Sequence, residues 1–165
     1  MRILVTGGAG FIGAYLVKDL IKKKHKVLSV DNFCGIGAIP YINPKSKFIR
    51  GDISDQKVLK SIKKWKPEVI YHLAAQSGGE TSYDDPKKDY LINGFGTYQI
   101  CQLGKELKIK NFIYTSTTAV YGSNSKKKID EDEKINPDSL YGISKFAGEM
   151  FVKQTFKKTK TKTII

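Results

Sequence analysis

The sequence predicts an α/β fold in which a doubly wound parallel sheet carries helices on both faces. Two observations predict it. Short apolar runs alternate along the chain with segments of helical periodicity, and a glycine-rich turn joins the first run to the first helix. The length of 165 residues fits one domain, and 40% hydrophobic with 27% charged residues is typical of globular proteins. We therefore expect a single domain over residues 1–165.

Short apolar runs are the expected strands, at Ile3–Val5, Val27–Val30, Lys47–Arg50, Val69–Leu73 and Asn111–Ser116. Helical periodicity and capping residues predict helices from Phe11 to Leu20, from a cap at Ser54 or Asp55 to Trp65, from Pro86 to about Leu107, and from Asp138 or Ser139 through Phe156. Thr163–Ile165 resembles the opening of a sixth strand, so we expect the sheet to be truncated there.

The glycine-rich turn predicts a dinucleotide site. Gly7, Gly10 and Gly13 follow a strand and open a helix. Backbone N–H groups and the helix dipole can hold a pyrophosphate there, provided that no Cβ blocks its approach. Asp31 follows at the tip of the second strand, where a carboxylate can accept the adenosine ribose hydroxyls and would repel a 2′-phosphate. The pattern therefore favours NAD over NADP.

Composition argues against several other classes of protein. The net charge of +13 comes almost wholly from lysines scattered over helix faces and loops, so we expect no nucleic-acid partner. No apolar run approaches the roughly 20 residues of a membrane span, and glycines interrupt the only signal-like segment, which favours a cytoplasmic protein. Cys34, Cys101, His25 and His72 do not cluster, so we expect no metal site.

Further motifs resemble those of the extended short-chain dehydrogenase/reductases, a Rossmann-like family that epimerises or dehydrates nucleotide sugars. They are Gly51-Asp52-Ile53, His72-Leu73-Ala74-Ala75 and Asn93 with Gly96-Thr97. The resemblance covers essentially the whole chain in the right order. It implies that NAD is bound by Gly7, Gly10, Phe11, Ile12, Gly13, Asp31, Asn32, Asp52, Ile53, Leu73, Ala74, Ala75, Asn93, Tyr141 and Lys145.

A catalytic Tyr-x-x-x-Lys pair must lie on one helix face, as residues i and i+4 do. The chain offers Tyr41–Lys45, Tyr83–Lys87 and Tyr141–Lys145. Proline interrupts the first two, since the residue before proline avoids the helical region. Only Tyr141 and Lys145 remain. The positive charge of Lys145 one turn away, the helix dipole and an oxidised nicotinamide would lower the pKa of the Tyr141 phenol, so that it can act as a base.

The third catalytic group should be one of four hydroxyls in Thr115-Ser116-Thr117-Thr118. The resemblance, anchored on Val120-Tyr121-Gly122, implies Thr117, whose hydroxyl would orient the reacting sugar hydroxyl toward Tyr141. The family's 4,6-dehydratases carry Asp-Glu directly after this residue, whereas this chain has Thr118-Ala119, which disfavours a dehydratase. The segment Gln76–Ser82 also departs from the commoner epimerase pattern and leaves the sugar open.

The favoured function is NAD-dependent epimerisation of a nucleotide sugar through a transient 4-keto intermediate, as in a UDP-glucose 4-epimerase. Alternatives are a dehydratase, reductase or decarboxylase of the same family, a catalytically incomplete NAD-binding fragment, or a basic nucleic-acid binder. The family's C-terminal substrate lobe is absent from residues 1–165, so we expect this chain alone to bind NAD without turnover. A homodimer through the helices at 86–107 and 139–158 is a further expectation from the resemblance.

Overall fold

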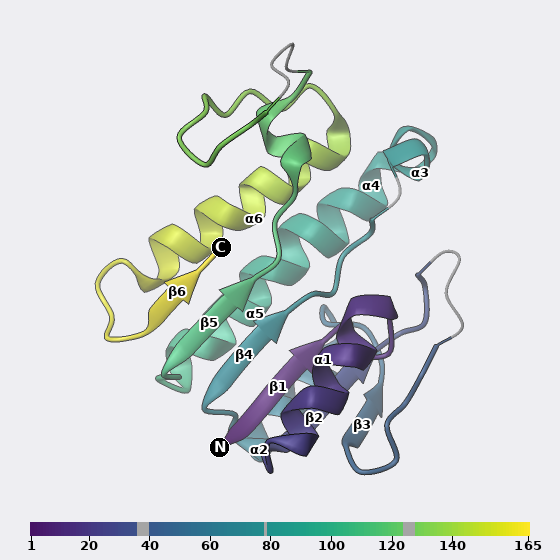
Figure 1. The fold of residues 1–165 in the computed structure, drawn as a ribbon, viewed down its shortest axis with the longest axis vertical. Helices are drawn as coiled ribbons and strands as arrows, with labels where there is room; N and C mark the ends of the chain where they lie inside the picture. The colour runs from purple at the N-terminus through teal and green to yellow at the C-terminus, as the bar shows by residue number, and fades with distance from the viewer. Residues whose placement is uncertain (36–39, 78, 124–127) are drawn as a thin grey trace.

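The computed structural model describes residues 1–35, 40–77, 79–123 and 128–165. They form a six-stranded sheet in the order β3-β2-β1-β4-β5-β6, with every neighbouring pair parallel (Figure 1). The strands are β1 Arg2–Thr6, β2 Lys26–Asp31, β3 Lys47–Arg50, β4 Val69–His72, β5 Asn111–Tyr114 and β6 Lys162–Ile164. The predicted doubly wound parallel sheet is confirmed.

The helices and helical turns lie between these strands. They are α1 Phe11–Lys22, α2 Gln56–Trp65, α3 Gly79–Asp84, α4 Pro86–Asp89, the π-helix η1 Tyr90–Gly96, α5 Thr97–Glu106, the 3₁₀ turn η2 Thr118–Tyr121 and α6 Leu140–Phe156. Of the caps left open by the sequence, Asp55 caps α2 by accepting from Lys57 N at 2.7 Å, and Ser139 caps α6 by accepting from Gly142 N at 3.0 Å.

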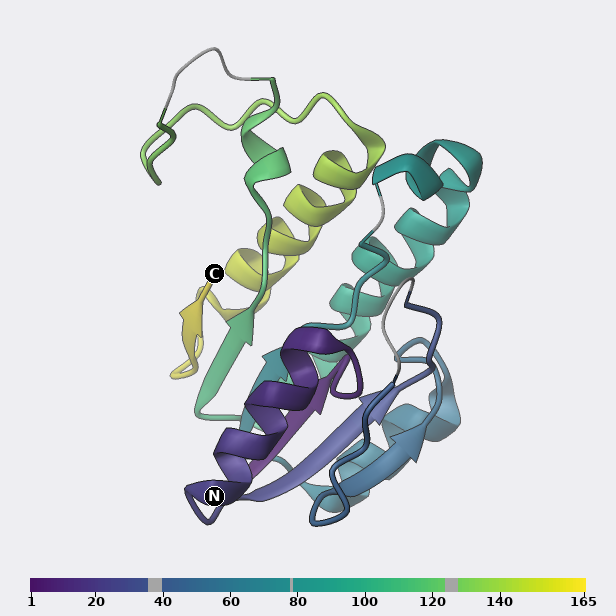
Figure 2. The same ribbon diagram turned by 45° about the vertical axis from the view of Figure 1, so that its right-hand side comes forward.

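Two apolar layers hold the helices to the sheet. On one face, Leu4, Ile70 and Phe112 pack with side chains of α2, α5 and α6. On the other, Ile3 and Val5 pack with side chains of α1. The two ribbon views agree: α1 crosses one face of the sheet, and α5 and α6 lie side by side on the other (Figures 1 and 2).

The chain departs from the sequence-based expectation in three places. The helix expected from Pro86 to Leu107 is helical throughout, but its middle is the π-helix η1, and α3 and η2 were not expected. Strand β5 ends at Tyr114 rather than Ser116. Thr115 N still donates to His72 O at 3.2 Å, but the Thr115 carbonyl oxygen and the Ser116 hydroxyl bind side chains of α6. The sequence indicated only the start of a sixth strand, but Lys162–Ile164 forms a strand that pairs with Asn111–Ile113 of β5.

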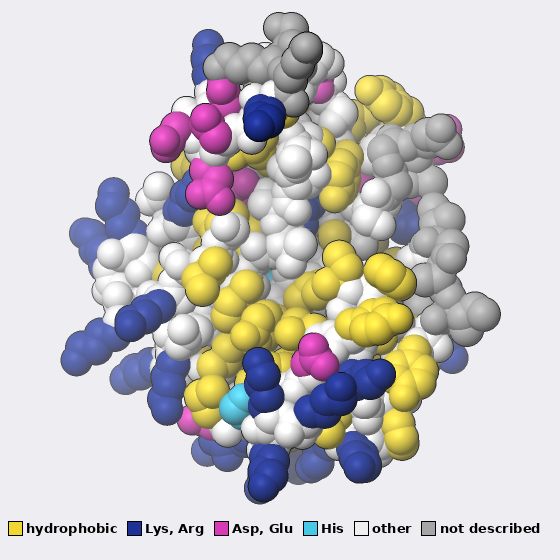
Figure 3. All heavy atoms as spheres, viewed as in Figure 1, with side chains coloured by type: hydrophobic (Ala, Val, Ile, Leu, Met, Phe, Trp, Pro, Cys, Tyr) yellow, Lys and Arg dark blue, Asp and Glu magenta, His cyan; other side chains and the backbone are white. Residues whose placement is uncertain are grey.

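Several lysines lie in the C-terminal turns of helices. Lys22 lies in the last turn of α1, Lys63 and Lys64 in that of α2, and Lys105 in that of α5. Cations there are stabilised by the negative end of the helix dipole. In the space-filling view, lysine and arginine side chains gather at the end of the molecule where the strands begin (Figure 3). No described helix is long and apolar enough to cross a bilayer.

Candidate active site

A pocket of about 320 Å³ lies at the carboxyl ends of β1, β2 and β4. This is the edge at which open parallel sheets bind ligands. Its walls include all of the predicted NAD-binding residues except Asn93, Tyr141 and Lys145. They are Gly7, Gly10, Phe11, Ile12, Gly13, Asp31, Asn32, Asp52, Ile53, Leu73, Ala74 and Ala75.

The glycines that line the pocket are required for different reasons. Gly7 has φ +69°, and a Cβ on it would lie 2.8 Å from Ala74 N. A Cβ on Gly13 would collide with the carbonyl oxygen of Gly7. At these two positions, contacts within the protein exclude a side chain whether or not a ligand is bound. Gly10 differs, because its Cβ would meet only the Gly7 carbonyl oxygen at 3.4 Å. The space in front of Gly10 is free for a ligand at the N-terminus of α1.

Two carboxylates line the pocket beyond the glycine loop. Asp31 accepts from the backbone N–H groups of Ala9 at 3.0 Å and Phe33 at 2.8 Å. Asp52 accepts from the Asn32 amide at 2.9 Å and from the backbone N–H and hydroxyl of Ser54. Each carboxylate offers about four lone-pair sites, so both are held in place and can still accept hydrogen bonds from a ligand.

Asn93 lies behind the pocket wall. Its side chain is 1% exposed; its amide donates to Gln76 O and Ser144 Oγ, and its carbonyl oxygen accepts from Gln76 N. Because these bonds occupy the side chain, Asn93 positions the chain leaving β4 against α6. Asn93 is also one of the predicted NAD-binding residues, and its place directly behind the pocket wall leaves that prediction open to test.

The exit of β5 contacts α6 at three consecutive residues. The Lys145 ammonium donates to the carbonyl oxygen of Thr115 at 2.6 Å, and Ser116 Oγ donates to Glu149 at 2.6 Å. The Thr117 side chain lies close enough to the Tyr141 phenol to oppose the rise of its pKa. Tyr141, Lys145 and Glu149 are successive i+4 positions on one helix face. The structure therefore brings together the three predicted catalytic residues.

The other two Tyr-x-x-x-Lys pairs do not share a helix. Tyr41 and Lys45 lie in the loop before β3, outside any helix. Tyr83 lies in α3 and Lys87 in α4, which begins after the N-cap Asp85. Pro44 and Pro86 thus have the effect expected from the sequence.

Burial shifts the pKa values of both Lys145 and Tyr141. Burial lowers the pKa of Lys145 to about 8, while the charge of Glu149 opposes that fall. Burial also raises the pKa of Tyr141, opposed by the Thr117 side chain and assisted by the charge of Asp89. Lys145 is not among the groups that shift the pKa of Tyr141 in the chain without cofactor. Its ammonium donates to Thr115 and lies 4.4 Å from the centre of the Tyr114 ring.

The family model described as GDP-mannose 4,6 dehydratase matches residues 4–165. The chain belongs to this family. Among curated relatives, the UDP-glucose 4-epimerase of Mycolicibacterium smegmatis is 35% identical over 158 residues, covering 92% of this chain and 50% of its own length. The human dTDP-D-glucose 4,6-dehydratase is 31% identical over 172 residues, covering 99% and 49%.

Two solved structures are closely similar. The Thermotoga maritima UDP-glucose 4-epimerase with UDP-glucose has a TM-score of 0.91 at 34% identity, over 99% of this chain and 53% of its own. The Thermus thermophilus UDP-glucose 4-epimerase with NAD has a TM-score of 0.90 at 30% identity, over 99% and 53%. The chain therefore spans about half the length of the members of the GDP-mannose 4,6 dehydratase family that it matches.

Sequence reasoning missed several residues of this family member's site. Ala9, Phe33, Cys34, Ser77, Ile92 and Thr115 also line the pocket. Thr115 was one of the four candidate hydroxyls, but it contributes its carbonyl oxygen, to which no side-chain pattern points. Glu149 was also missed, although its i+4 spacing from Lys145 was a readable signal. Among the side chains that the structure describes, no three metal-binding groups come together.

Proposed function

We propose that this chain carries the NAD site and the catalytic residues of a nucleotide-sugar epimerase that resembles UDP-glucose 4-epimerase. The observation that carries the proposal is the meeting of Thr117, Tyr141 and Lys145 at the exit of β5, beside a pocket with a glycine loop and a carboxylate. The similarity to epimerases solved with UDP-glucose and with NAD supports it.

The pocket fits NAD. The free space at Gly10 leaves room for the pyrophosphate at the start of α1, where no side chain caps the helix. The Asp31 carboxylate would accept the adenosine ribose hydroxyls, and Asp52 would accept the adenine amine. NAD held by these residues would supply the acceptor for a hydride from the sugar carbon and the donor that returns it.

The protein's own residues move the proton. Tyr141 would take the proton of the sugar's C4 hydroxyl, leaving a 4-keto sugar, and return it when the carbon is reduced from the other face. Thr117, whose side chain lies close to the Tyr141 phenol, would orient that hydroxyl. Because burial raises the pKa of Tyr141, its phenolate form needs positive charge nearby. Lys145 would supply part of it and hold the nicotinamide ribose.

The residues after Thr117 argue against dehydration. Water elimination needs a general acid and base at neighbouring carbons, and Thr118-Ala119 provides neither carboxyl group. In the structure this pair begins the 3₁₀ turn η2, which follows Thr117 directly. Epimerisation is therefore favoured over the dehydratase chemistry of some relatives.

The proposal includes a homodimer and a place in cytoplasmic carbohydrate metabolism. The helices at 86–107 and 139–158 expose large side chains, namely Leu91, Phe95, Tyr98, Ile143 and Met150. Such a face suits a second copy of the chain. Free Cys34 and Cys101 accord with a reducing compartment.

The test is a coupled assay for interconversion of UDP-glucose and UDP-galactose, run on the full-length product of the gene with added NAD. Dehydration of dTDP-glucose is measured beside it. Epimerisation without dehydration is expected. Dehydration without epimerisation, or binding of NAD with turnover of neither sugar, would contradict the proposal.

A further inference from the structure

The Lys145 ammonium is buried without a charged hydrogen-bond partner. The residue is 2% exposed, and its nitrogen binds the Thr115 carbonyl oxygen and faces the Tyr114 ring. Neither group carries a formal charge. A buried cation costs several kcal/mol unless an opposite charge lies nearby. Lys145 therefore needs a negatively charged group nearby, and none of the residues given a role in the proposed reaction has been assigned to that task.

The groups around Lys145 point to Glu149. Tyr114 from β5 and Tyr141 from α6 are neutral phenols with pKa values raised by burial. His72 from β4 is neutral as well, because burial and the Lys145 charge lower its pKa to about 3. The charge of Asp89, from α4, raises the pKa of Tyr141. Glu149, one turn after Lys145, is the carboxylate whose charge favours protonated Lys145.

Glu149 is itself held in place. It is 5% exposed, and each of its oxygens has a donor. Ser116 Oγ donates to Oε1 at 2.6 Å, and Lys153 Nζ donates to Oε2 at 3.1 Å. Ser116 lies between Thr115, which receives Lys145, and Thr117, whose side chain lies close to Tyr141. The carboxylate is thus fixed to the segment that carries the catalytic contacts.

We propose that Glu149 is a positioning residue for Lys145: anchored by Ser116 and Lys153 one helical turn away, its carboxylate keeps the buried ammonium charged. This deepens the proposed function, since it concerns the lysine expected to hold the nicotinamide ribose. Glu149 touches neither substrate nor cofactor in this role. It acts through Lys145.

The test is an NMR titration of the chain labelled with [ε-¹³C]lysine. The Lys145 signal is identified by its loss in Lys145→Arg. In the unaltered chain its midpoint is expected at about 8. Glu149→Gln can still accept from Ser116 but lacks the charge, so the midpoint should fall by about one pH unit or more. A merely structural Glu149 would leave the midpoint where it is.

Glu106→Gln is the matched control. It removes a carboxylate that pairs with Lys63 at the protein surface, away from Lys145, so the Lys145 midpoint should not fall. An unchanged midpoint in folded Glu149→Gln overturns the proposal. If that variant does not fold, Ser116→Ala decides: loosening Glu149 should lower the midpoint by a smaller amount, and no change overturns the proposal.

NAD binding separates this proposal from the proposed function. If the unaltered chain binds no NAD, the proposed function fails, whatever the titration shows. If NAD binds and the Lys145 midpoint is the same in Glu149→Gln as in the unaltered chain, only the proposal on Glu149 fails.

Discussion

The carboxylate of Asp31 accepts a hydrogen bond from the backbone N–H of Ala9 at 3.0 Å. This bond joins the end of β2 to the glycine loop that follows β1. The other carboxylate oxygen accepts from Phe33 N at 2.8 Å. The residue expected to choose between NAD and NADP therefore also fixes the loop that would hold the pyrophosphate. In the proposed function, the choice of cofactor and the conformation of the loop would thus depend on the same side chain.

Alanine substitutions at two glycines should separate binding from folding. A Cβ on Gly10 meets no protein atom closer than 3.4 Å, so Gly10→Ala should fold normally. It should nevertheless lose NAD affinity by about tenfold or more, because the methyl group occupies the space for the pyrophosphate. Gly13→Ala collides with the Gly7 carbonyl and should lower the free energy of unfolding by about 2 kcal/mol. Calorimetry and denaturant unfolding measure the two effects, and equal losses of stability would refute the distinction.

Tyr141→Phe should remove turnover while leaving NAD affinity nearly intact. The phenol oxygen is the proposed proton carrier, and a general base commonly contributes about 10²–10⁴-fold to rate. Lys145→Ala should damage both turnover and NAD binding, since that side chain serves both. The measurements are the epimerase assay on the full-length gene product and an NAD titration.

Tyr83→Phe is the control for this assignment. Tyr83 is 67% exposed on α3 and belongs to a chance Tyr-x-x-x-Lys pair. Its removal should change neither rate nor affinity. Near-native turnover by Tyr141→Phe would show that another group carries the proton.

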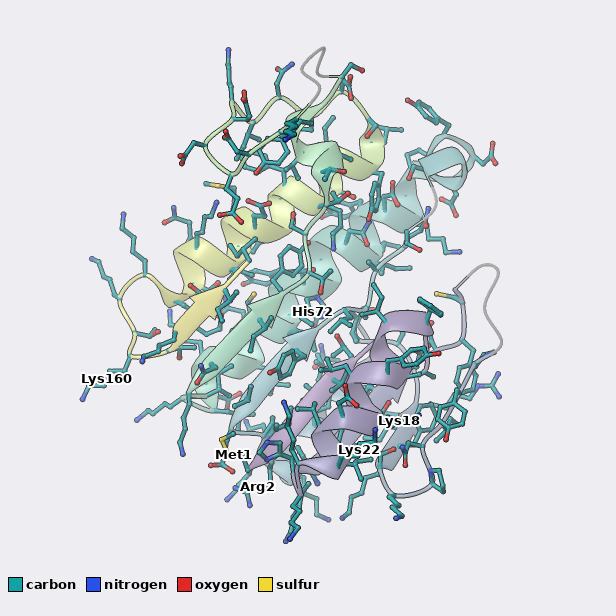
Figure 4. All side chains as sticks on the ribbon, in the orientation of Figure 1. Met1, Arg2, Lys18, Lys22, His72 and Lys160 are labelled. Carbon is teal, nitrogen blue, oxygen red and sulfur yellow. The ribbon has the colours of Figure 1, made fainter. Side chains whose placement is uncertain are left out.

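His72 should make the stability of the fold depend on pH in acid. The residue lies at the end of β4 in the middle of the sheet (Figure 4), where both ring nitrogens hydrogen-bond to threonines, Thr6 at 2.6 Å and Thr97 at 2.9 Å. Burial lowers its pKa from 6.5 to about 3. Between these values the unfolded chain binds a proton that the folded chain does not.

The His72 contribution is therefore fully present above about pH 6.5 and is lost as the pH falls toward 3, by up to about 1.4 kcal/mol per pH unit. Urea unfolding at a series of pH values measures it. His72→Gln should be less stable at pH 7 but should flatten this slope, whereas His25→Gln should leave the profile unaltered. The same slope in His72→Gln would assign the effect to other groups.

Local patterns were enough to predict the strands, the caps and most of the pocket. Apolar runs placed β1 to β5, and the glycine spacing with Asp31 placed the pocket walls. The π-helix η1 was not predictable, because its seven residues make fewer than two turns, too short a stretch for apolar periodicity to distinguish it from an α-helix. It contains Asn93, whose partners Gln76 and Ser144 are 17 and 51 residues away along the sequence.

The surroundings of Tyr141 show a second feature that the sequence could not predict, namely the direction of the neighbouring lysine side chain. An i+4 spacing places Lys145 on the same face as Tyr141, but it does not say where the ammonium points. That direction is set by the Thr115 carbonyl and the Tyr114 ring, both on a different segment. For the same reason Ser116 and Glu149, 33 residues apart, could not be paired from the sequence.

Calorimetric titration of the chain with NAD and with NADP tests whether it carries the proposed NAD site. NAD should bind at least about tenfold more tightly, because the Asp31 carboxylate would repel a 2′-phosphate on the adenosine ribose. Asp31→Ala should reduce that preference, whereas Asp19→Asn, which removes an acidic charge from the exposed side of α1, should not. No binding of NAD, or equal or tighter binding of NADP, would contradict the account.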